Sequence, residues 1–177
     1  PATGLTLGIP GEGAADAAVR KYAGMKLDSA LEAQSWVDTG EDLLRQAGVR
    51  SQRAGKAMPD PATGDAILKA IQGEGPAPPG FTAVVADVKA KMAIETAEML
   101  AADPSFTNRM IPGEYFPRMW RMPKKTGPGA GALGGKPFFF KQRSPKTYTE
   151  LRAEGYEPVS WNPYHMLALR RMAGTDY

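Results

Sequence analysis

The sequence predicts a mainly α-helical fold: an irregular assembly of helices joined by long extended Pro/Gly-rich segments, with little or no sheet. Small and apolar residues recur at steps of three and four over residues 28–47 and 82–102, the spacing of one helix face. Between such stretches lie most of the 20 Gly and 16 Pro, which interrupt regular elements. With 177 residues, the chain can form one domain with a modest core or two small ones.

Residues 1–13 are expected to form an extended arm. Its large apolar residues alternate with small or polar ones: Leu5, Leu7 and Ile9. An arm of this kind is usually covered by another subunit or by further chain, because a lone apolar patch is unfavourable in water. Since the sequence starts at Pro1 without a methionine, we expect a fragment of a longer protein, with several copies packed side by side.

Four helices are expected in the first half, at residues 14–23, 28–47, 63–72 and 82–102. Gly24, Gly48 and Gly73 follow the first three as stop signals, and Asp28 is the expected N-cap of the second. That second helix carries a seam of mostly small residues, Ala30, Ala33, Val37, Gly40, Leu44 and Ala47. The seam should allow a close approach by another helix, and the 82–102 helix is the expected partner.

The 82–102 helix should be the spine of the helical half, because Pro104 ends it and one stripe is apolar: Val85, Val88, Met92 and Met99. Glu95 lies on the same stripe. We expect its carboxylate at the edge of the stripe in water, and a catalytic acid is the alternative.

Residues 111–123 form an aromatic run fenced by three prolines, here named the clasp. Proline lacks an N–H and disfavours a helix before it, so side chains must hold this segment in place. It should dock on the protein's own helices; a groove for a peptide or nucleotide and an anchor between subunits are the alternatives. The expected interaction residues are Tyr115, Phe116, Trp120, Phe138, Phe139, Phe140 and Trp161.

Charge divides the chain into an acidic helical segment, residues 1–104, and a basic wrap, residues 105–177. The first part holds 10 Lys or Arg against 14 Asp or Glu, and the second holds 12 against 5. The two parts are expected to attract each other within one structural unit; a nucleic-acid face is the alternative. Its candidate contacts are Arg118, Arg121, Lys124, Lys125, Lys141 and Arg143.

No cofactor or metal site is predicted. Residues 124–136 contain a G-x-G-x-x-G pattern without the strand and helix that a dinucleotide site needs, so a mobile surface loop is expected there. The chain has no Cys, which excludes a Cys-based zinc site, and its single His is His165. No small-molecule substrate and no membrane-spanning segment are expected either.

Two short helices are expected near the C-terminus. Thr147 or Thr149 should cap the first, which Gly155 stops, and Asn162 with Pro163 should begin the second. The second should bury an apolar face made of Met166, Leu167, Leu169 and Met172.

Three motifs follow one another in the basic part: EYFPRMW at residues 114–120, FFKQRS at 139–144 and TELRAEGYEPVSWNPYHMLAL at 149–169. This succession resembles a segment of the polyvalent and internal virion, or ejection, proteins of tailed phages, over about residues 105–175. Those proteins are long, mostly helical chains that carry enzymatic modules along them. The resemblance implies a non-enzymatic helical segment packed in the capsid and delivered to the host cell with the DNA.

The leading expectation is therefore a structural and interaction role inside the virion, with other copies or other virion proteins, portal or core, as partners. A nucleic-acid-binding module that uses the basic part to hold DNA is the first alternative, and part of an antirestriction polyvalent protein is another. An enzyme that uses Glu95 or Glu114 as acid or base is the weakest, since no partner group is visible.

Overall fold

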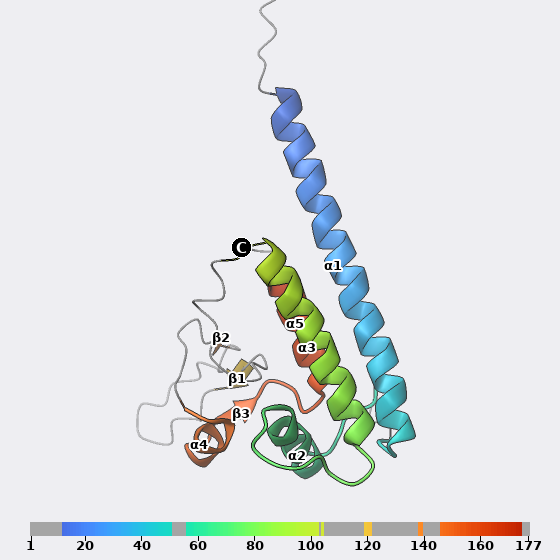
Figure 1. The fold of residues 1–177 in the computed structure, drawn as a ribbon, viewed down its shortest axis with the longest axis vertical. Coiled ribbons are helices and arrows are strands. Elements are labelled where there is room, and N and C mark those ends of the chain that lie inside the picture. The colour runs from blue at the N-terminus through green and yellow to red at the C-terminus, as the bar shows by residue number, and fades with distance from the viewer. Residues whose placement is uncertain are drawn as a thin grey trace, which may run out of the picture.

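The computed structural model of the protein describes residues 12–50, 56–102, 104, 119–121, 138–139 and 146–174. Within them the chain is mainly helical, which confirms the expected fold class (Figure 1). The helices are α1 (Glu12–Gln46), α2 (Pro61–Ile71), α3 (Thr82–Ala102), α4 (Tyr148–Ala153) and α5 (Pro163–Gly174). The strands are β1 (Met119–Arg121), β2 (Phe138–Phe139) and β3 (Glu157–Pro158).

The three strands form one small antiparallel sheet with β1 in the centre. Met119 pairs with Phe139 on one side, and Trp120 pairs with Pro158 on the other. The arm at residues 1–11, the clasp apart from residues 119–121, and the Gly-rich segment 124–136 lie outside the described residues, as do the expectations attached to them.

A single long helix, α1, replaces the two helices expected at residues 14–23 and 28–47, so the break at Gly24 and the N-cap at Asp28 were wrong. A glycine inside a helix costs only about 1 kcal/mol relative to alanine, which does not end a helix by itself. Gly48 does end α1, because it adopts φ 93° and lets the Val49 N–H donate to the Leu44 carbonyl.

The other helix ends follow from capping. The carboxylate of Asp60 accepts from the N–H groups of Ala62 and Thr63, so α2 begins two residues before the expected start. Helix α3 has the expected bounds. Thr147 caps α4 in a capping box with Glu150, as one of the two threonines was expected to do.

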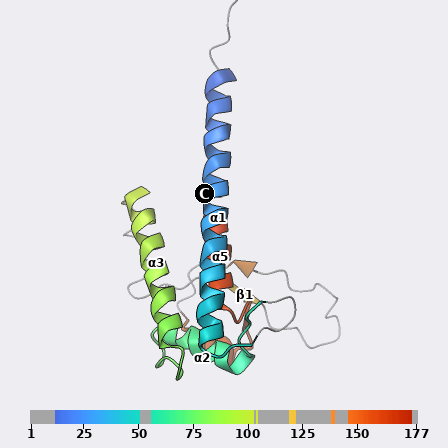
Figure 2. The ribbon, with the colours of Figure 1, turned by 90° about the vertical axis from the view of Figure 1, so that its right-hand side faces the viewer.

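Helix α5, and not α3 as expected, covers most of the seam of α1. The ring of Tyr164 lies directly on Gly40, where a Cβ would overlap the ring, and Ala33, Gly40 and Leu44 are all buried. Figures 1 and 2 show α3 and α5 beside the C-terminal half of α1 only, while the N-terminal half of α1 continues alone.

Only two of the four residues expected on the buried apolar face of α5 are buried. Met166 and Leu167 are buried, but Leu169 and Met172 are 40% and 52% exposed. Instead of these two, Arg170 and Arg171 turn toward the neighbouring helices and form ion pairs there. The pairing of charge across the helices therefore sets the rotation of α5 about its axis.

Trp120, a residue of the clasp, belongs to the hydrophobic core and is 2% exposed. Its ring centroid is 5.1 Å from that of Tyr148 and 6.5 Å from that of Tyr156. Trp161 is only partly buried, with the Arg152 guanidinium 5.1 Å from its ring centroid. The core joins residues of both the acidic and the basic part, from Trp36 to Leu167, in one cluster.

Replacing Gly40 by Ala should destabilise the protein by about 1–3 kcal/mol, because the new methyl group overlaps the Tyr164 ring. The matched change Gly24→Ala, at a position with no atom within 4 Å of the added Cβ, should stabilise by about 0.5–1 kcal/mol. Urea unfolding of both variants checks this pair. A Gly40→Ala variant as stable as the parent chain would contradict the described contact between α1 and α5.

Replacing Trp120 by Ala should cost about 3–5 kcal/mol, since it leaves a large cavity beside Tyr148. The same change at the partly buried Trp161 should cost less. Denaturant unfolding followed by circular dichroism measures both. Equal losses at the two positions would be inconsistent with their different burial.

Candidate functional site

The large apolar side chains that remain exposed are concentrated on the N-terminal half of α1. Of the eight in the described residues, four lie there, Val19 at 64%, Tyr22 at 49%, Met25 at 55% and Leu27 at 60% exposed, and Leu31 at 61% lies just past the middle of the helix. Every residue from 16 to 28 is exposed, and this stretch of helix is about 20 Å long at about 1.5 Å per residue. Because monomeric proteins rarely leave such a surface in water, it is the strongest candidate for an interaction site.

These side chains divide between two faces of the helix. At about 100° per residue, Val19, Tyr22 and Met25 lie within about 60° of the direction of Gly40, the face that α5 covers further along. Leu27 and Leu31 point to the opposite side. Val19, Tyr22 and Met25 therefore continue the covered face of α1 beyond the end of α5, and we call them the uncovered inner face.

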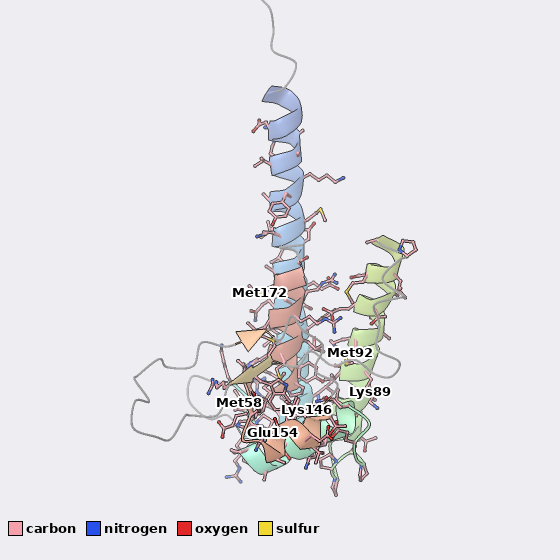
Figure 3. All side chains as sticks on the ribbon, turned by 90° about the vertical axis from the view of Figure 1, so that its left-hand side faces the viewer. Met58, Lys89, Met92, Lys146, Glu154 and Met172 are labelled. Atoms are coloured by element: carbon pink, nitrogen blue, oxygen red, sulfur yellow. The ribbon has the colours of Figure 1, made fainter. Side chains whose placement is uncertain are left out.

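The end of α5 is fixed by ion pairs. Arg171, one turn before the end of α5, binds Glu32 of α1 and Glu98 of α3. Its guanidinium also lies 5.5 Å from the centroid of the buried Trp36 ring. Figure 3 shows Met172 near the end of α5, with α1 continuing well past it. The uncovered inner face begins at this level.

A buried ion pair joins α5 to α3. The Arg170 Nε atom lies 3.1 Å from Glu95 Oε2, and the Glu95 carboxylate is almost fully buried, so the expectation of a carboxylate in water was wrong. Burial raises the pKa of the Glu95 carboxyl, and the positive charges of Arg170 and Arg171 oppose that rise. The pair is a structural link between helices.

A second polar contact joins α5 to α1. His165 Nε2 lies 3.6 Å from Glu41 Oε1, and burial lowers the pKa of His165 while Glu41 opposes that change. Beside it, the fully buried Asn162 donates from Nδ2 to the Ala57 carbonyl and accepts from the Tyr164 N–H, each at 2.9 Å. His165 therefore lies in a structural network that holds the start of α5.

The predicted interaction residues are divided by the structure. Trp120 is enclosed by the protein's own side chains and offers no surface to a partner. Phe138 and Phe139 form β2 beside β1, and Trp161 is partly buried against α2, where its Cβ lies close to Gly64. Tyr115, Phe116 and Phe140 lie outside the described residues.

Of the predicted nucleic-acid contacts, only Arg121 is described. Its side chain is exposed and donates from a terminal nitrogen to the Val159 carbonyl at 3.1 Å, across the small sheet. The other five are outside the described part: Arg118, Lys124, Lys125, Lys141 and Arg143. Glu114, the other candidate acid, is outside it as well.

A cleft of about 320 Å³ lies between the C-terminal end of α1 and the start of α2. Its walls include Arg50, Met58, Asp60 and Phe81. The Asp60 carboxylate is already engaged as the cap of α2, and hydrogen bonds to Thr63 lower its pKa. Among the described residues, no group of three or more His, Cys, Asp or Glu side chains could hold a metal ion.

No protein-family model, curated protein or solved structure matches this chain. In the described part of the chain, no helix has the length and apolar character needed to cross a membrane.

The sequence contained a signal for the exposed face that our sequence analysis missed. The seam of α1 was followed back only to Ala30, because Gly24 was interpreted as the end of a separate helix. At about 100° per residue, the side of the helix that holds Gly40 continues through Gly24 to Met25, Tyr22 and Val19.

Replacing Arg170 by Met should cost about 3–5 kcal/mol at pH 7, because the buried Glu95 carboxylate loses its nearest positive charge. The pKa of Glu95 should then rise further above its unfolded value. A carboxyl of this kind loses stabilising free energy as the pH rises through its folded pKa, so the deficit of the variant should shrink from pH 7 to pH 5.

Urea unfolding at both pH values measures the deficit. Arg20→Met is the matched control, since it removes a cation whose ion pair with Asp16 is exposed on both sides and should cost less than about 1 kcal/mol. A deficit at Arg170 that is no larger than the control would be inconsistent with a buried pair.

Proposed function

We propose that this chain is a structural and interaction segment of a tailed-phage internal virion, or ejection, protein. In this role it is packed in the capsid, contacts other copies or other virion proteins, and passes to the host cell with the DNA. The observation that carries the proposal is the long helix α1, whose N-terminal half stands away from the core and exposes large apolar side chains. A helix of this kind functions by contact with another protein surface.

The positions of the motif residues also support a structural role. In the succession at residues 149–169, the described side chains that are most deeply buried are Leu151, Asn162, Tyr164 and Leu167. They pack the core or cap α5, and Trp120 of the first motif lies in the same core. The motifs that resemble phage virion proteins therefore encode packing, which suits a segment that spaces or assembles other modules.

A structural role is also favoured over the DNA-binding alternative by Arg121. This is the one candidate DNA contact within the described residues, and its guanidinium is bonded to the Val159 carbonyl. We assign no catalytic step to the chain, because Glu95 serves as the partner of Arg170.

The test is to find the protein in virus particles. An antibody raised against the 177-residue chain should detect it in purified particles of the phage that encodes it, and protease added outside intact particles should leave it undigested. After DNA release it should be depleted from the empty shells, while the major capsid protein, the control, stays constant. A protein abundant in infected cells but absent from purified particles would contradict the proposal.

A further inference from the structure

We propose that the outer face of α1, the side opposite Gly40, pairs with the same face of a second copy, the two helices running antiparallel over residues 20–38. The proposal rests on the proposed structural role and names a partner for it. The outer face is made of exposed residues that lie within about 60° of the direction opposite Gly40: Arg20, Gly24, Leu27, Leu31, Gln34 and Asp38.

No described residue of another element covers the outer face. Helices α3 and α5 pack on the other sides of α1, where Tyr164 lies on Gly40 and Arg171 pairs with Glu32. Figure 2 looks at α1 from its free side and shows its full length in front of the other helices. A second α1 can therefore lie along the outer face without meeting α3 or α5 of either copy. The uncovered inner face offers less room, because the last turns of α5 occupy that side at the level of Glu32.

Two leucines form the centre of the outer face. Leu27 and Leu31 are 60% and 61% exposed, and the steps from Gly24 through both leucines to Gln34 are three, four and three residues. This is the spacing of the seam between paired helices. In an antiparallel pair centred between the leucines, Leu27 meets Leu31 of the second copy, and the contact occurs twice by symmetry. Gly24 meets Gln34 of the second copy, and the open space at Gly24 has room for that side chain.

The next layer outward fixes the direction by charge. In the antiparallel register Arg20 meets Asp38 of the second copy, and this ion pair also occurs twice. The Gln34 amide donates to the Asp38 carboxylate at 2.7 Å and holds it on the outer face. Two parallel helices in register would instead place Arg20 against Arg20 and Asp38 against Asp38, which repels at both ends.

The neighbouring charges favour the same direction. On and beside the outer face, the charged residues near the N-terminal end sum to one net positive charge and those near the C-terminal end to one net negative charge: Asp16, Arg20 and Lys21 against Asp38, Asp42 and Arg45. The antiparallel pair places each positive end on a negative end. Asp16 and Asp42 approach each other there, but each pairs with an arginine of its own chain, at 2.9 and 2.7 Å.

A matched pair of lysine substitutions tests which face pairs. Leu31→Lys should raise the dimer dissociation constant at least about tenfold, because it places a charge in the apolar centre. Met25→Lys makes a similar change at a similar exposure, 55%, on the inner face and should leave the constant unchanged within about twofold. Sedimentation equilibrium of the 177-residue chain at low salt, from micromolar to submillimolar concentration, measures each constant. Far-UV circular dichroism checks that each variant is folded.

Charge reversal tests the direction and the register. Arg20→Asp and Asp38→Arg should each place like charges opposite each other twice and raise the dissociation constant at least about tenfold. An equimolar mixture of these variants should form a heterodimer, and the double variant Arg20→Asp/Asp38→Arg should dimerise as the parent chain does. Arg50→Asp is the control for net charge, since this exposed residue lies beyond the end of α1, and it should leave the constant unchanged within about twofold.

One like-charge contact gives a prediction in the opposite direction. In the proposed register Asp28 lies near Asp28 of the second copy, on one flank close to the twofold axis. Asp28→Asn removes this repulsion and should lower the dissociation constant. An Asp28→Asn variant that pairs more weakly than the parent chain would contradict the register.

A parent chain that stays monomeric over the whole concentration range overturns the pairing. A dimer weakened by Met25→Lys but not by Leu31→Lys overturns it too, and assigns the contact to the uncovered inner face. Charge reversals that weaken the dimer and are not restored in the mixture or the double variant overturn the antiparallel register. None of these outcomes affects detection in virus particles. A dimer that obeys the charge rules, with no protein in particles, would refute the virion role alone.

Discussion

The ion pair between Arg170 and Glu95 is the constraint on which the arrangement of the helices depends. Two charges that are both largely removed from water are stable only when they meet in good geometry, so α5 must lie where Arg170 reaches α3. With that contact made, Arg171 falls between Glu32 and Glu98, and Tyr164 reaches the flat surface that Gly40 leaves on α1. The same rotation turns Leu169 and Met172 outward, which explains why a helix with apolar residues on two sides buries only one of them.

The short-range features of this fold were accessible from the sequence because their causes are local. The bounds of α3, the capping of α4 by Thr147 and the start of α5 at Asn162 and Pro163 each depend on groups a few residues apart. Gly48 adopts a positive φ and ends its helix, as expected, whereas Gly24 lies inside α1. The residues next to the two glycines do not distinguish these two outcomes. A glycine ends a helix only where the residues after it leave the helical dihedral angles.

The contacts between helices far apart in the sequence could not be predicted from the spacing of apolar residues. An apolar stripe predicts that a helix is covered, but it does not name the element that covers it, so the seam of α1 was assigned to α3 although α5 lies there. Glu95 illustrates the same limit: a carboxylate at the edge of a stripe and one buried against an arginine have the same local pattern. The partner that separates them, Arg170, lies 75 residues along the chain.

The candidate interaction surface arises from a mismatch in helix length. Helix α1 has 35 residues and α5, the helix that covers its inner face, has 12, so at about 1.5 Å per residue the longer exceeds the shorter by roughly 35 Å. Both ends of α1 contribute to that excess, but the N-terminal end carries the exposed Val19, Tyr22 and Met25. This side of α1 carries large apolar side chains beyond the end of α5 as well as under it, so the burial of Val19, Tyr22 and Met25 requires a surface from outside the described fold.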